Sequence, residues 1–74
     1  SNTGEFIIVI NISKKQDVKI HLLNATGQVI YEENLNQYSG SYKRTIDLNE
    51  YSKGIYNLQL VTDKETIIKR IIVE

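Results

Sequence analysis

The chain has 74 residues, with nine basic and nine acidic side chains, one histidine and no cysteine. This length predicts a single domain over residues 1–74. The zero net charge argues against a nucleic-acid-binding protein, which needs a basic surface, and the lack of cysteine excludes disulfides and thiolate metal sites. No apolar run approaches the roughly 20 residues that span a bilayer, so no transmembrane segment is expected. Ser1 and Asn2 are interpreted as a remnant of expression.

The beginning of the chain shows a pattern typical of β-strands. Residues 5–12 are almost all β-branched or apolar, which favours a strand over a helix in so short a segment. A polar connection follows at 13–16. Residues 18–22 then alternate apolar and polar side chains, which predicts a second strand with one face toward water.

A hairpin is expected next. Asn24 and Gly27 occupy the first and fourth positions of a predicted type I turn, with Gly27 in the left-handed region. Residues 28–33 form the return strand. Residues 34–41 are polar and predict an exposed loop, and residues 42–48 predict a fourth strand.

The most informative stretch is a corner that leads into an alternating strand. Residues 49–53 predict the corner, with one 3₁₀ turn, and residues 54–62 predict the strand. Gly54 lies where the chain must turn sharply, because a residue without Cβ tolerates positive φ. Tyr56 has two interpretations: a core aromatic residue, or a tyrosine corner whose hydroxyl bonds to backbone around 51–53.

The chain closes with a tight polar turn at 63–65 and a last strand at 66–73. Lys69 and Arg70 interrupt this apolar strand. In an edge strand such charges hinder aggregation, or they contact a partner. Successive residues of a strand point to opposite faces, and the sequence leaves open which of the two points outward.

Six strands at a spacing of about 8–12 residues, without any helical period, predict an all-β fold. The expected architecture is a small antiparallel immunoglobulin-like β-sandwich with Greek-key-like connections and six to seven strands.

No residues are expected to form a catalytic, metal or cofactor site, so an enzyme is not predicted. His21 has no second ligand or nucleophile partner in the sequence pattern. Glu32 and Glu33 are neighbours in a strand and point to opposite faces, so they do not converge as a catalytic pair. An aromatic binding platform of Tyr38, Tyr42 and Tyr51 is a weak alternative.

Four segments follow one recognisable order. Residues 2–6 place Asn and Gly before a Phe-led strand, and residues 21–31 form a hairpin whose turn ends in Gly before a strand with Val and Tyr. Residues 46–58 contain Asp-Leu, a short turn and Gly-x-Tyr, and residues 69–73 place basic residues before an apolar tail. Together these segments resemble the C-terminal sorting domain (type A) of proteins exported by the type IX secretion system of Bacteroidetes. The chain departs from that pattern in lacking proline near its opening and in having Arg70 beside Lys69 where Lys is usual.

The resemblance implies a signal that directs an N-terminal cargo protein through the periplasm and across the outer membrane to the cell surface or the medium. The implied partners are the outer-membrane translocon and a sortase that cleaves the domain and attaches the cargo to lipopolysaccharide. Gly54 and Tyr56 are expected to set the shape, and the residues expected to be recognised are Lys69, Arg70, Ile71, Ile72, Val73 and Glu74. Gly4, Asn24, Gly27 and Gly54 are expected at structural turns.

Two further possibilities follow from the strands themselves. Pairing of the first or last strand with a second copy gives a possible homodimer. The alternative function is an immunoglobulin-like accessory module that binds glycan or protein, or that separates domains.

Overall fold

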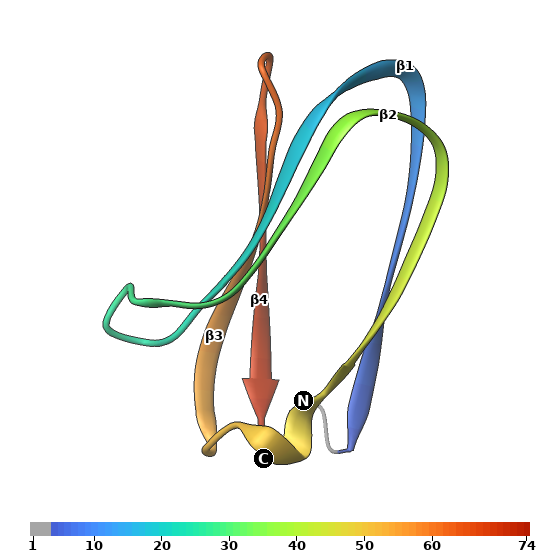
Figure 1. Cartoon of the computed structure of the whole chain (residues 1–74). Coiled ribbons are helices and arrows are strands. Elements are labelled where there is room, and N and C mark those ends of the chain that lie inside the picture. Colours follow the sequence, from blue (N-terminus) through green and yellow to red (C-terminus); the bar gives the residue numbers. More distant parts are fainter. Residues whose placement is uncertain (1–3) are drawn as a thin grey trace.

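The computed structural model describes residues 4–74, which form one antiparallel sheet. Its elements are β1 (Glu5–Leu23), β2 (Val29–Asp47), the 3₁₀ helix η1 (Leu48–Glu50), β3 (Gly54–Val61) and β4 (Thr66–Val73). The strand order is β2-β1-β3-β4 (Figure 1). The prediction of an all-β antiparallel fold is confirmed. The interpretation of Ser1 and Asn2, and the start of the opening segment, lie outside the described residues.

The predicted number of strands and their division into two sheets are wrong for the described residues. In place of six to seven strands in a Greek-key sandwich, four strands form one open sheet. The polar residues 13–16 belong to β1, and the predicted loop 34–41 belongs to β2, so each strand is 19 residues long. Polarity indicates exposure, but here the two polar segments run beside each other as parts of the strands, with Gln16 paired to Tyr38 between two register shifts.

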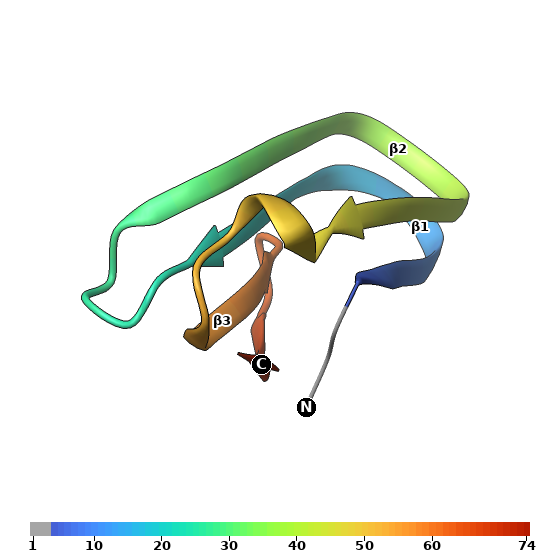
Figure 2. The same cartoon turned by 90° about the horizontal axis from the view of Figure 1, so that it is seen from below.

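Irregular pairing bends this long hairpin. The register between β1 and β2 shifts between Ile12 and Gln16, and again between Gln16 and Val18. Extra residues on one strand bend and twist a β-ladder. Figure 1 shows both strands turning over together at this point, and Figure 2 shows the arch that they form over β3 and β4.

The Asp17 side chain stabilises the irregular pairing at this bend. Its Oδ1 atom accepts hydrogen bonds from the backbone N–H of Gln37 at 2.8 Å and from the Gln37 side-chain amide at 3.0 Å. Gln37 has a φ of 48°, which is uncommon for a residue with a Cβ. The contacts of Asp17 therefore hold Gln37 in the backbone conformation that the bend requires.

The core lies on the inner side of the arch. One cluster joins both halves of the hairpin, and a second lies where η1, β3 and β4 meet. The buried residues of the first are Ile8, Ile12, Val18, Ile20, Leu35 and Ile46; those of the second are Leu22, Leu48, Tyr56, Ile71 and Val73. The bend thus lets one sheet cover both sides of its own core, as two sheets do in a sandwich.

Two predicted turns are present. The N–H of Gly27 donates to the carbonyl of Asn24 at 3.0 Å, and Gly27 has a φ of 88°. In the corner, the carboxylate of Asp47 accepts from the N–H of Asn49 at 2.9 Å and caps η1. The 3₁₀ turn expected in this corner is confirmed.

Candidate functional site

Tyr56 fastens the corner between η1 and β3. Its side chain is 5% exposed, and its hydroxyl donates to the backbone carbonyl of Ser52 at 2.5 Å. The ring of Tyr51 packs against it with the ring centres 6.0 Å apart. The tyrosine-corner interpretation is confirmed, and it gives Tyr56 a structural task.

Strand pairing places this corner directly beside the last strand. Gly54 pairs with Val73, and Tyr56 pairs with Ile71. The two segments that the sequence selected for shape and recognition are therefore neighbours in space. Ile71 and Val73 are buried against Leu48 and Tyr56, so their side chains complete the core and are covered.

The outward-facing side chains of β3 and β4 make an apolar surface with a basic residue in its middle. Cross-strand pairs join Ile55 with Ile72, Asn57 with Arg70, and Gln59 with Ile68. We call Ile55, Ile68, Arg70 and Ile72 the β3–β4 outer face. All four are exposed, and Ile68 is the most open of its isoleucines at 59%.

Sequence reasoning missed two members of this surface. Ile55 and Ile68 were not selected, although the alternation in both strands already separated them from the core residues. What the sequence lacked was the register that sets Ile55 opposite Ile72. Glu74 follows the strand and is exposed.

Lys69 and Arg70 lie on opposite faces of β4. Arg70 belongs to the outer face, opposite Asn57, whereas Lys69 lies opposite Leu58 on the face that carries the core. Lys69 nevertheless remains exposed, because it borders an open hollow together with Ile8 and Leu58. The structure therefore answers which of the two basic residues points outward.

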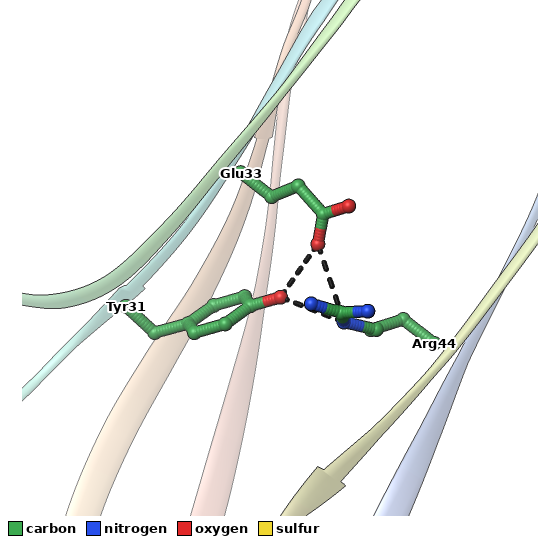
Figure 3. A network of polar contacts seen from close by, with 3 residues as sticks. All are labelled: Tyr31, Glu33 and Arg44. Atoms are coloured by element: carbon green, nitrogen blue, oxygen red, sulfur yellow. Dashed lines mark hydrogen bonds and ion pairs between the residues drawn. The ribbon is translucent and has the colours of Figure 1, made fainter.

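A polar network joins the two halves of β2 across the arch (Figure 3). The carboxylate of Glu33 accepts from the hydroxyl of Tyr31 at 2.5 Å and lies 3.3 Å from Nε of Arg44. Arg44 also donates to the Tyr31 hydroxyl at 3.0 Å. Tyr31 and Glu33 come from the first half of β2 and Arg44 from the second, so the network fastens one side of the arch.

The network also changes the acidity of its members. The Tyr31 hydroxyl is the largest cause that lowers the pKa of Glu33 below its ordinary value of 4.5, and the Tyr42 hydroxyl and the charge of Arg44 add to it. Burial is the largest cause that raises the pKa of Tyr42. The Tyr42 hydroxyl lies close to Glu33 but makes no hydrogen bond of ordinary geometry within residues 4–74. Glu33 is therefore a firmly ionised carboxylate, suited to an ion pair and unsuited to proton transfer near neutral pH.

The other candidate residues make contacts with neighbouring side chains within the fold. His21 lies on the outward face of β1 as predicted, with Nε2 2.6 Å from Oε2 of Glu32, while Glu33 faces inward. The proposed platform of Tyr38, Tyr42 and Tyr51 is wrong, because all three rings pack against the core and Tyr38 meets Tyr42 edge to face. Among residues 4–74 no three side chains of the metal-binding type come together. No helix in the described part of the chain is long and apolar enough to cross a membrane.

Comparison with known proteins identifies one family. The family described as "Secretion system C-terminal sorting domain" matches residues 5–74. This match covers all four strands and the corner. A comparison with curated proteins finds no match.

Proposed function

The chain belongs to the family of secretion system C-terminal sorting domains, and from this premise we propose that the β3–β4 outer face is the surface that the export machinery reads. The domain is a sorting signal of the type IX secretion system. It directs a cargo protein joined to its N-terminus to the cell surface or out of the cell, and its partner in doing so is the type IX machinery.

The composition and position of the outer face support this proposal. Protein interfaces combine apolar contact with a few charged groups that set orientation. Ile55, Ile68 and Ile72 supply exposed apolar area, and Arg70 supplies a charge between them. The side chains of this face are exposed in the described chain, so the face is open to a partner, and β4 is also an edge strand of the sheet.

The corner supports the same proposal because it lies under the strands that carry the contact residues. A signal that is read as a folded shape needs its contact residues held in a fixed arrangement. Tyr56 and Val73 lie on the core side of the two strands that carry the outer face. We therefore assign Gly54 and Tyr56 to shape, and Arg70 and Ile72 to contact.

The function is tested by fusing residues 1–74 to the C-terminus of a fluorescent protein that is delivered to the periplasm. We expect the reporter at the surface or in the medium of a strain with a working type IX system, and only in the periplasm of a translocon-null strain. Retention in both strains, beside a known signal that is exported, would refute the sorting role of this chain.

The surface is tested in the same competent strain with Arg70→Glu and Ile68→Asn. Both side chains are exposed, so the fold should persist, and we expect the exported fraction to fall several-fold. Lys43→Glu is the matched control, because Lys43 is an exposed base on β2, away from β3 and β4. Equal export of Arg70→Glu and Lys43→Glu would show that the outer face is not read.

Three finer points remain proposals. We propose that the domain has no catalytic activity of its own, in keeping with a family that acts as a signal. We also propose that a sortase removes it after export, which the mass of the exported reporter would test. A homodimer through the β4 edge is a further possibility, for which sedimentation of the purified chain is the measurement.

A further inference from the structure

One half of β1 has an unpaired side. Along Glu5–Val18 this strand pairs only with β2 within the described chain, because β3 joins it only from Lys19 to Leu23. One side of the hairpin arch is therefore two strands wide, while the other half of the sheet is four strands wide (Figure 1). An unpaired strand side presents free N–H and C=O groups in a row.

A groove runs along this unpaired side. Three adjoining hollows of about 350, 150 and 270 Å³ follow one another between β1 and the core-side face of β3 and β4. The first two share Ile8, Leu58 and Lys69, and the second and third share Ile10, Leu60 and Ile67. They therefore form one continuous groove, which we call the β1–β4 groove.

The groove leaves core-type side chains in contact with solvent. Leu58, Leu60 and Ile67 share the face of the sheet that carries the buried core residues Ile20 and Ile71. Ile67 is nevertheless 51% exposed, and both leucines are only half-buried. One additional strand beside β1 would cover this face and would pair with the free backbone groups at the same time.

We propose that the β1–β4 groove is an acceptor site for an extended strand of a partner protein, with alternating apolar residues and one carboxylate that meets Lys69. Addition of a strand to a free sheet edge is a general mode of peptide binding, in which backbone hydrogen bonds supply affinity and alternate side chains supply specificity. The segment from Phe6 to Ile12 accommodates about seven residues of extended chain.

The charge of the groove indicates which kind of strand it binds. The charged side chains beside the groove are Lys64, Glu65 and Lys69, two bases and one acid, because Arg70 borders the groove but its side chain points to the opposite face of β4. Lys69 forms no ion pair with any residue of the described chain. A strand with a carboxylate opposite Lys69 is therefore favoured over an uncharged or basic strand.

A second copy of this chain fits the groove poorly. The free edges of the sheet are β2, β4 and the first half of β1, whose segment from Phe6 to Ile12 has no carboxylate to meet Lys69. An edge formed by β4 would bring Lys69 and Arg70 of the second copy to a groove that is already basic. The carboxylates of β2 are engaged within the chain: Glu32 with His21, Glu33 with Tyr31 and Arg44, and Asp47 with the N–H of Asn49.

The test uses the 74-residue chain and a fluorescent synthetic peptide of about nine residues. The peptide has valine at every second position, threonine between, and aspartate in place of the central valine. We expect saturable binding by fluorescence anisotropy, and binding weaker by roughly five- to tenfold when lysine replaces the aspartate. Proline at two neighbouring central positions should abolish binding, because the N–H groups of neighbouring residues point to opposite sides of a strand and one of the two must face β1.

The protein side of the test exchanges the charge. Lys69→Glu should reverse the preference, so that the lysine peptide binds more tightly than the aspartate peptide, whereas Lys43→Glu should leave it unchanged. Hydrogen exchange should show new protection at alternate amides between Phe6 and Ile12. Absence of binding, an unchanged preference in Lys69→Glu, or protection confined to β2 would overturn the proposal. So would a dimer that occupies the groove and excludes the peptide. Binding is measured without secretion, so this result is independent of the export assay.

Discussion

Tyr56 shows how much one polar atom contributes to the shape of this domain. Its ring lies in the core beside Leu48 and Ile71, while its hydroxyl reaches back to the carbonyl of Ser52. The hydrogen bond fixes the short connection between η1 and β3, and with it the position at which β3 starts. At the residue scale, the corner therefore rests on one side chain that is apolar along its length and polar at its tip.

We expect Tyr56→Phe to lower the free energy of unfolding by about 1–2 kcal/mol, because the ring still packs but the carbonyl of Ser52 loses its donor. Urea unfolding followed by circular dichroism measures the change. Tyr51→Phe is the control, since Tyr51 packs beside Tyr56 and its hydroxyl makes no hydrogen bond within residues 4–74. Equal losses in both variants would mean that packing, and not the hydrogen bond, holds the corner.

Glu33 provides a second residue-scale prediction, in which the pH dependence has a definite sign. Its pKa is lowered in the folded state, chiefly by the Tyr31 hydroxyl, so its ionised form stabilises the fold. That contribution is fully present above the ordinary pKa of 4.5 and is lost as the pH falls through the lower, folded value. Glu33→Gln should cost about 1 kcal/mol at neutral pH and should flatten the loss of stability toward acid.

Urea unfolding between neutral and acidic pH tests this difference. Glu65→Gln is the matched control, because the Glu65 side chain is exposed and forms no ion pair in the described chain. A Glu33→Gln variant with the same acid profile as the unmodified chain would show that the network does not fasten the arch.

At the element scale, the decisive feature is that a hairpin of two long strands bends where its ladder is interrupted, and pairing resumes on both sides of the bend. Register shifts around Gln16 and the positive φ of Gln37 produce the bend. Without it, Ile8 and Ile20 would lie along one flat ribbon and could not belong to the same buried cluster. The bend also leaves the unpaired side of β1 that borders the β1–β4 groove.

Asp17→Ala should loosen this bend. The backbone N–H of Gln37, followed by its side-chain amide, lowers the pKa of Asp17 below its ordinary value of 3.8, so the contact is strongest when the carboxylate is ionised. The variant should increase hydrogen exchange at the Gln37 amide while exchange at β3 and β4 changes little. Asp63→Ala, in the exposed turn before β4, is the control. An unchanged Gln37 amide would contradict the assigned role.

At the scale of the whole molecule, recognition and folding share the same last strand. β4 carries Arg70 and Ile72 outward, and it carries Ile71 and Val73 into the core. Deletions from this end therefore test two properties together. Only substitutions of exposed side chains, such as those of the outer face, separate recognition from folding.

Deletion of residues 70–74 should unfold the domain. Burial of each aliphatic side chain contributes about 1.5–3 kcal/mol, and a domain of this size has a total stability on the order of 5 kcal/mol. Circular dichroism should show loss of the β signal, whereas deletion of Glu74 alone should leave it intact. A folded domain after the longer deletion would show that the hairpin and β3 are sufficient.

The sequence by itself determined the local features and the family. Alternation defined β3 and β4 almost to the residue, Asn24 and Gly27 located a turn, and the spacing of Gly54 and Tyr56 indicated the corner. These predictions succeeded because each depends on side chains close together in the chain: a strand buries every second residue, and a turn needs particular φ angles.

Only the tertiary structure decided how the strands combine. It joined residues 13–16 and 34–41 into two long strands, because each polar segment continues beside the other and pairing resumes on both sides of the register shifts. It also set Ile55 opposite Ile72, placed Arg70 and not Lys69 on the outer face, and brought Glu33 to Arg44 across the arch. Each of these outcomes depends on how the strands pair and bend, and so on contacts between residues that are not neighbours in the chain. A pattern with a period of two specifies which residues share a face but not which residue lies opposite which, and folding therefore decides the pairing.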